Sequence, residues 1–309
     1  MKHPTLYVLL LFTALADVAW AQNRTFSAQH IEGEPRLEMI RSHRKQPSGE
    51  PPLLFVHGYQ MGAWIFEDHY LPFFYEKGYD VCAVNLRGHG WSEGAEEIER
   101  ATLEEYYTDL ERAVNYVQAE TGETPILIGF SMGAVLTQEY IHRHQPQAAV
   151  LLGMGNPRFG IPSFRNWIQR HTGEYDSANL PTLHHDPAFL RALFFGDDEQ
   201  PKGHKKYITK LVAQAGSQVV WTDLENYTPQ PAKSAKVLIV AGEQDPFTPS
   251  AALKYVRNLY DAEILILENT RHGVPVAESW KKGAKGILQF LRQLPVEEKV
   301  SLMGVEAEH

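Results

Sequence analysis

Three residues of this sequence have the types and the order needed for nucleophilic catalysis by a serine hydroxyl. Ser131 lies at the centre of the G-x-S-x-G segment 129–133, and Asp245 and then His272 follow it along the chain. A serine hydroxyl is a weak nucleophile at neutral pH and needs a neighbouring base, which in turn needs an acid to orient it. We therefore predict Ser131 as the nucleophile, His272 as the base and Asp245 as the orienting acid.

The sequence around Ser131 predicts a sharp turn between a strand and a helix. An apolar run at 125–128 precedes the motif, and a helical pattern at 134–144 follows it. Gly129 and Gly133 are expected there, because a Cβ at either position collides with neighbouring backbone in such a turn. A purely structural turn is the alternative, but the position between a buried strand and a helix favours a nucleophile.

The base and the acid are each expected just after a strand. His272 follows the run 263–267 and precedes a helix, which makes it the best placed of the fourteen histidines. Asp245 follows the run 237–241, and the order Ser, Asp, His is the one that this kind of turn predicts. Glu243, two residues before Asp245, is the reserve candidate for the acid.

Acyl transfer also needs two preorganised hydrogen-bond donors for the oxyanion of the intermediate. The backbone N–H of Met132, the residue after the nucleophile, is the first candidate. The second should come from the loop 57–60, which follows the first expected parallel strand, and we assign it to the N–H of Tyr59. His57 is expected to have a structural role under that loop.

These positions require an α/β fold with a mainly parallel sheet. Short apolar runs predict strands at 53–56, 81–86, 126–129, 148–152, 237–241 and 263–267. Helical spacing predicts helices at 103–117, 134–144, 253–259 and 276–294, and Thr102 with Glu105 has the spacing of a capping box. Near-continuous apolar strands that alternate with helices are typical of a sheet with helices on both faces.

Residues 156–232 interrupt this alternation. They are hydrophilic, less periodic and rich in proline, histidine and aromatic residues. We predict a helical lid inserted here after the strand 148–152, above the edge of the sheet. The core is then divided into residues 22–155 and 233–294, and a polar tail covers 295–309.

The N-terminus has the order of a secretory signal peptide. Lys2 precedes an apolar run at 5–16, and Ala19-Trp20-Ala21 places a cleavage site after Ala21. A membrane anchor needs about 20 apolar residues, and Asp17 interrupts this run; a buried N-terminal helix is the other alternative. We therefore expect residues 1–21 to be removed from a secreted or periplasmic protein without an integral membrane span.

The composition narrows the classes of partner. A hydrophobic content of 43% and a charged content of 22% are ordinary for a globular protein. The net charge of −9, with no long run of lysine or arginine, argues against a nucleic-acid partner. The single cysteine, Cys82, lies in an apolar run and is expected to be an inert buried thiol.

The successive motifs resemble those of the α/β-hydrolase fold family. The landmarks that match, from about residue 50 to 294, are His57-Gly58, segment 87–92, segment 129–133, Asp245 and His272. The resemblance is closer to small esterases and lysophospholipase-like hydrolases than to epoxide hydrolases or haloalkane dehalogenases, which carry Asp where Ser131 stands. It implies a sheet of eight strands with a cap after the sixth. Asn85 departs from the Asp that many relatives carry at this usually structural position.

The leading hypothesis is therefore a serine hydrolase that cleaves a carboxylic ester through an acyl-enzyme, with a small to medium hydrophobic acyl group. Neither a cofactor nor a metal is required. Three alternatives stay open: a cofactor-free C–C bond hydrolase, a lactonase, and a non-catalytic protein that binds a small molecule.

A metal site is suggested by His184, His185, Asp186 and His204. Their spacing does not match H-E-x-x-H, however, and solvated histidines are commoner. Segment 87–90 lacks both G-x-G-x-x-G and the P-loop lysine, so no nucleotide is expected.

Overall fold

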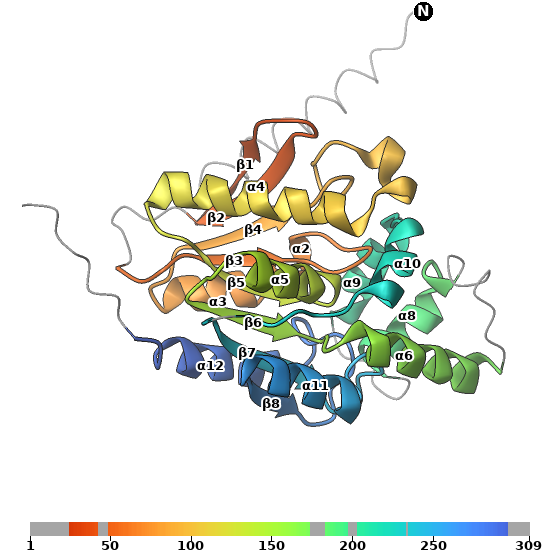
Figure 1. The fold of residues 1–309 in the computed structure, drawn as a ribbon. Helices are drawn as coiled ribbons and strands as arrows, with labels where there is room; N and C mark the ends of the chain where they lie inside the picture. The colour runs from red at the N-terminus through yellow and green to blue at the C-terminus, as the bar shows by residue number, and fades with distance from the viewer. Residues whose placement is uncertain (1–24, 43–48, 174–182, 197–202, 233, 296–309) are drawn as a thin grey trace, which may run out of the picture.

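The computed structural model describes residues 25–42, 49–173, 183–196, 203–232 and 234–295 (Figure 1). The predicted signal peptide, residues 1–21, lies outside these ranges, as does all but the first residue of the predicted C-terminal tail. Both stay predictions.

An eight-stranded sheet forms the centre of the molecule (Figure 1). Its strand order is β1-β2-β4-β3-β5-β6-β7-β8. β2 is antiparallel to both β1 and β4, and all other neighbouring strands are parallel. The prediction of a mainly parallel sheet of eight strands is confirmed. The strands are β1 (Phe26–Ile31), β2 (Leu37–Ser42), β3 (Leu53–Val56), β4 (Val81–Asn85), β5 (Ile126–Phe130), β6 (Ala148–Leu152), β7 (Lys236–Gly242) and β8 (Glu263–Leu267).

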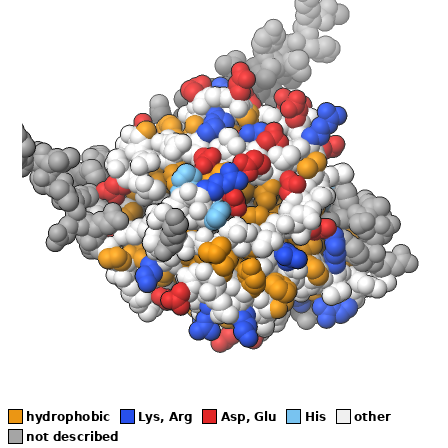
Figure 2. All heavy atoms as spheres, viewed as in Figure 1, with side chains coloured by type: hydrophobic (Ala, Val, Ile, Leu, Met, Phe, Trp, Pro, Cys, Tyr) orange, Lys and Arg blue, Asp and Glu red, His pale blue; other side chains and the backbone are white. Residues whose placement is uncertain are grey.

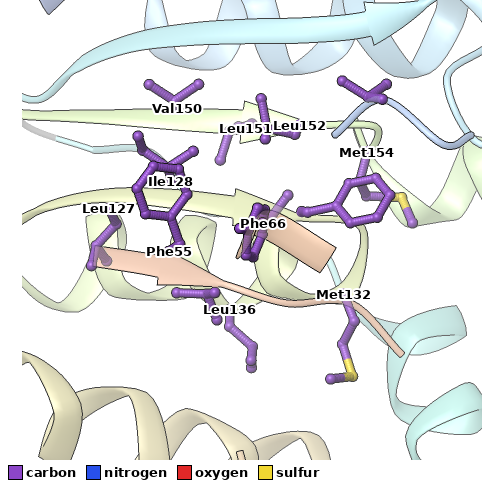
Figure 3. Packing of buried hydrophobic residues seen from close by; sticks show 14 of the residues in the cluster. Phe55, Phe66, Leu127, Ile128, Met132, Leu136, Val150, Leu151, Leu152 and Met154 are labelled. Carbon is purple, nitrogen blue, oxygen red and sulfur yellow. The ribbon is translucent and has the colours of Figure 1, made fainter. Parts of the chain in front are cut away.

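The hydrophobic sequences of the central strands follow from their place in the sheet. Every residue of β3, β4, β5 and β6 is buried, because helices cover both faces of these strands. β8 is at the edge and leaves Glu263 and Ile266 exposed. Figure 3 shows how Phe55 of β3, Ile128 of β5 and Val150 of β6 lie side by side in this core. The strands that carry the candidate site are thus held on both sides by close packing.

Helices cover both faces of the sheet, as predicted (Figure 1). α4 and α5 contact each other on one face, and α3 and α12 contact each other on the other. The predicted capping box begins α4: the N–H of Glu105 donates to Thr102 Oγ1 at 3.2 Å, and the N–H of Thr102 donates to Glu105 Oε2 at 2.8 Å. The helices of the core are α2 (Trp64–Glu67), α3 (Tyr70–Glu76), a 3₁₀ helix (Ala95–Arg100), α4 (Leu103–Thr121), α5 (Met132–Arg143), α11 (Ser250–Tyr260) and α12 (Trp280–Leu291).

Between β6 and β7 the described chain forms further helices, which we call the inserted helices. They are α6 (Pro157–Thr172), α8 (Pro187–Phe194), α9 (His204–Ala213) and α10 (Val219–Asn226). They lie beside the ends toward which the arrows of β3, β5 and β6 point in Figure 1. β6 is the sixth strand of the chain, and these helices fall within the predicted segment 156–232.

Cys82 is buried in β4, and burial raises the pKa of its thiol to about 12. This burial agrees with the inert thiol that the sequence predicted.

On the surface, acidic and basic side chains are interspersed over the face seen in Figure 2. None of the helices in the described ranges combines the length and the apolar character needed to cross a bilayer.

Candidate active site

Ser131 occupies the sharp turn that the sequence predicted. β5 ends at Phe130, α5 begins at Met132, and Ser131 between them has φ 55° and ψ −118°. A left-handed φ is unfavourable for a residue with a Cβ, so the surrounding structure must hold this conformation. One such contact is the hydrogen bond from the N–H of Ser131 to the carbonyl of Leu152 in β6, at 2.8 Å.

The two glycines of the motif allow strand and helix to approach closely. A Cβ on Gly129 would lie 2.2 Å from the carbonyl oxygen of Gly133 and 2.4 Å from Thr137 Oγ1. A Cβ on Gly133 would lie 2.2 Å from the carbonyl oxygen of Val56 at the end of β3. All three distances are far shorter than van der Waals contact, so the predicted steric need for glycine at these positions is confirmed.

The structure brings Ser131, His272 and Asp245 together. His272 Nε2 lies 3.0 Å from Ser131 Oγ, and His272 Nδ1 lies 2.9 Å from Asp245 Oδ2. All three residues are nearly removed from solvent: Ser131 is 6% exposed, Asp245 5% and His272 2%. A carboxylate on Nδ1 holds the proton there and leaves Nε2 free to accept the proton of the serine hydroxyl.

Asp245 is itself oriented by backbone. Its Oδ1 accepts a hydrogen bond from the N–H of Phe247 at 2.9 Å, which leaves Oδ2 for His272. Glu243, the reserve candidate, is exposed and accepts from the N–H of Asn269 at 3.0 Å instead. The geometry therefore favours Asp245 over Glu243 as the partner of His272.

The loop 57–60 lies against the turn that carries Ser131. A Cβ on Gly58 would lie 2.8 Å from the Cβ of Ser131 and 3.1 Å from the carbonyl oxygen of Phe130. Gly58, the residue before Tyr59, is therefore in close contact with Ser131. Met132 is the first residue of α5, where the N–H groups have no partner within the helix. Both backbone groups predicted as oxyanion donors thus belong to segments in contact around Ser131.

His57 supports the same loop as a neutral residue. Its Nε2 accepts the N–H of Leu86 at 3.1 Å, and its Nδ1 donates to the carbonyl of Gly58 at 2.8 Å. Burial without a counter-charge lowers the pKa of His57 well below its usual value, and the neighbouring His89 lowers it further. These contacts match the structural role that the sequence predicted for His57.

Aromatic rings surround His272 and continue into the inserted helices. The ring of His272 lies 5.1 Å from that of Phe130, 5.4 Å from that of Phe194 and 4.6 Å from that of Phe247. Phe247 in turn stacks on Phe164 of α6 at 4.2 Å. The sequence pattern did not single out Phe164, Phe194 or Phe247 as neighbours of His272, since nothing in the local spacing shows which aromatic rings meet in space.

The histidines considered as metal ligands have other contacts. Asp186 is the N-cap of α8 and accepts from the N–H of Ala188 at 2.7 Å. His184 stacks on Trp221 at 5.3 Å, and burial lowers its pKa to about 3. Within the described ranges, no three histidine, cysteine, aspartate or glutamate side chains are grouped as ligands for a metal ion.

Asn85, the departure from the family pattern, has a structural position. Its Oδ1 accepts from the N–H of Ala63 at 2.7 Å, and its Nδ2 donates to the buried Glu38 at 2.6 Å. Asn85 therefore ties the end of β4 to β2 and to the turn before α2.

Comparison with known proteins gives the family. A family model described as alpha/beta hydrolase fold matches residues 51–275, and the chain belongs to this family. The AB hydrolase superfamily protein YisY of Bacillus subtilis (strain 168) is 25% identical over an alignment of 248 residues, and the match covers 74% of this chain and 88% of that protein. Membership of this family supports hydrolase activity.

Two solved structures show the same fold. Epoxide hydrolase A from Mycobacterium thermoresistibile superimposes with a TM-score of 0.66 at 18% identity, over 88% of this chain and 100% of that one. A thermostable carboxyl esterase from Bacillus coagulans superimposes with a TM-score of 0.63 at 16% identity, over 88% of this chain and 99% of that one. At these identities the likeness concerns the fold, so the choice between reactions depends on the residues of this chain.

Proposed function

We propose that this protein is a serine hydrolase that cleaves carboxylic esters through an acyl-enzyme on Ser131. The observation that carries the proposal is the buried chain of contacts from Ser131 Oγ to His272 Nε2 at 3.0 Å and from His272 Nδ1 to Asp245 Oδ2 at 2.9 Å. Epoxide hydrolases share the fold but carry Asp at the nucleophile position, where this chain has Ser131. The serine therefore favours ester cleavage over epoxide opening.

Acylation follows from the positions of these atoms. Ser131 Oγ attacks the carbonyl carbon of the ester while its proton moves to His272 Nε2. The carbonyl oxygen becomes an oxyanion that accepts hydrogen bonds from the N–H groups of Tyr59 and Met132. The intermediate then collapses, the C–O bond to the alcohol breaks, and His272 gives its proton to the departing alkoxide.

Deacylation repeats these steps with water. His272 takes a proton from a water molecule as its oxygen attacks the acyl carbon, and the second tetrahedral intermediate uses the same two N–H groups. The bond to Ser131 Oγ breaks, and the proton returns to the serine. Asp245 keeps the proton of His272 on Nδ1 in both halves, so every proton passes through Nε2.

The surroundings of the site support a hydrophobic substrate. Phe164, Phe194 and Phe247 are buried, two of them directly against His272. Tyr59 packs against Trp221 of α10 at 5.3 Å, so apolar surface also lies on the oxyanion side. We propose that the inserted helices form the lid of this site and that the acyl group is small to medium in size and apolar.

The test compares the wild-type protein with Ser131→Ala. Hydrolysis of p-nitrophenyl acetate and octanoate should fall by about 10⁴-fold or more, as serine nucleophile variants generally show, and labelling by a fluorophosphonate probe should be lost. Ser250→Ala, at an exposed serine at the start of α11, is the control and should behave as wild type.

The other outcomes separate the alternatives. Labelling of Ser131 without turnover of either ester would contradict the ester substrate and favour a C–C bond hydrolase or a lactonase. A wild-type protein that reacts with neither ester nor probe would contradict the serine-hydrolase mechanism itself and favour a protein that only binds a small molecule.

A further inference from the structure

The loop that carries His272 is hydrogen-bonded to an inserted helix. The N–H of His272 donates to the carbonyl of Leu193 at 3.1 Å, and the N–H of Gly273 donates to the carbonyl of Phe194 at 3.1 Å. Both acceptors are in the last turn of α8, where helix carbonyls have no partner within the helix. The loop and the helix end therefore satisfy each other's backbone groups.

The contact is too close to be incidental packing. A Cβ on Gly273 would lie 2.6 Å from the carbonyl oxygen of Phe194, so the two backbones touch directly. The ring of Phe194 also meets the ring of His272 edge-on at 5.4 Å. The ring of Phe194, the last residue of α8, thus contacts His272 itself, and its carbonyl group holds the next residue of the loop, Gly273.

α8 is in turn part of the inserted helices and not of the core. Asp186 caps its first turn, Phe189 packs on Trp167 of α6 at 5.6 Å, and α8 contacts α9. If the inserted helices move away from the sheet together, the two hydrogen bonds to the loop of His272 must break.

The inserted region also holds the loop that carries the proposed oxyanion donor. Gln60, next to Tyr59, has a φ of 56° and is 3% exposed. Its Nε2 donates to the carbonyl of His184 at 2.9 Å and to the carbonyl of Gln214 at 2.7 Å. Two separate loops of the site are therefore tied to the segment between β6 and β7.

We propose that α8 positions His272, so that the active site is complete only while the inserted helices are docked. Opening of these helices then lowers turnover instead of switching it on, unlike a lid that only covers a finished site. The inference rests on the proposed function, because it takes His272 as the base. It assigns Phe194 and Leu193 as positioning residues that act through His272.

The first test variant is Gly273→Ala, whose methyl group forces α8 and the loop apart. A misplacement of a catalytic group by about 1 Å can cost on the order of 10²-fold in rate. We therefore expect kcat to fall by about 10²-fold, and by the same factor for p-nitrophenyl acetate and for p-nitrophenyl octanoate. KM for both esters should stay within about threefold. Gly286→Ala in α12 is the control, since its Cβ meets only the side-chain end of Leu265, and kcat should stay within about twofold.

A second variant tests α8 without touching the site or the loop. Asp186→Ala removes the capping hydrogen bonds at the far end of α8 and should loosen the helix while the protein still folds. We expect a several-fold lower kcat for both esters, and faster hydrogen–deuterium exchange in peptides covering 268–276. Faster exchange in these peptides is also expected for Gly273→Ala, and it is measured independently of activity.

Three results would overturn the inference. One is a Gly273→Ala protein with a changed KM for the octanoate ester and an unchanged kcat for the acetate ester, which would indicate that α8 only lines the substrate pocket. Another is a higher kcat in Asp186→Ala, and a third is unchanged exchange at 268–276 in both variants. Failure of the proposed function looks different: the wild-type protein then fails to react with the fluorophosphonate probe, while the exchange experiment still decides whether α8 holds the loop.

Discussion

Replacing Asp245 by asparagine isolates the role of one carboxylate oxygen. In the structure Oδ1 accepts the N–H of Phe247 at 2.9 Å, and Oδ2 accepts Nδ1–H of His272 at 2.9 Å. The amide of Asp245→Asn has a single oxygen, and the N–H of Phe247 is a donor that only an oxygen can satisfy. The NH₂ group is therefore directed at His272.

The consequence is the wrong tautomer of the imidazole. Because the amide NH₂ group donates a hydrogen bond, Nδ1 of His272 must accept it and cannot carry the proton. The proton is then on Nε2, where it points at the hydroxyl of Ser131. The base can then no longer take the proton of the nucleophile. For Ser-His-Asp triads this exchange costs about 10⁴-fold in kcat, which is ~5.4 kcal/mol of activation free energy.

The assay is p-nitrophenyl acetate turnover by the wild-type protein, Asp245→Asn and the matched control Glu243→Gln. Glu243 is exposed, and its side chain accepts a hydrogen bond from the N–H of Asn269 and not from His272, so the control should keep kcat within about twofold. Thermal unfolding should show that Asp245→Asn folds. A folded Asp245→Asn protein that keeps a tenth of the activity, or a Glu243→Gln protein that loses it, would refute the assignment of the acid.

Two further predictions concern stability and the turn at Ser131. Burial lowers the pKa of His89 to about 4 and that of His184 to about 3, so below pH 6.5 the unfolded chain binds protons that the folded chain does not. The free energy of unfolding, measured in urea, should therefore fall as the pH is lowered from about 6.5 to 4, by up to ~1.4 kcal/mol per pH unit for each histidine. His184→Phe should make the free energy of unfolding less dependent on pH. Equal stability of the wild type at pH 7.5 and pH 5 would contradict this prediction. Gly129→Ala puts a Cβ 2.2 Å from the carbonyl oxygen of Gly133, so we expect about 1–3 kcal/mol of destabilisation and loss of fluorophosphonate labelling, whereas a stable, fully labelled variant would disprove the steric argument.

The central sheet and the turn at Ser131 were predictable because their physical causes are local in sequence. A strand buried on both faces must be apolar throughout, and β3, β4, β5 and β6 each show this as a short uninterrupted run. The hairpin of β1 and β2 was not located, since β1 lies at an edge and mixes polar residues such as Gln29 and His30 with apolar ones.

The choice of acid and the neighbours of the base depended on contacts between distant parts of the chain. Asp245 and Glu243 are equivalent in type and nearly so in position, and only the turn after β7, with the N–H of Phe247, directs one of them to His272. The hydrogen bonds from the loop of His272 to α8 join backbone atoms, which every residue has. No residue type marks such a contact, so no sequence pattern could have predicted it.

The order of the site along the chain has a consequence for synthesis. Ser131 is translated 141 residues before His272, and Asp245 27 residues before it. Contacts between residues so far apart form late in folding, because long loops must close first. An emerging chain that ends before His272 thus contains Ser131 without the base proposed for it. On the proposed mechanism, ester hydrolysis should therefore begin only after β8 and the loop that carries His272 have joined the sheet.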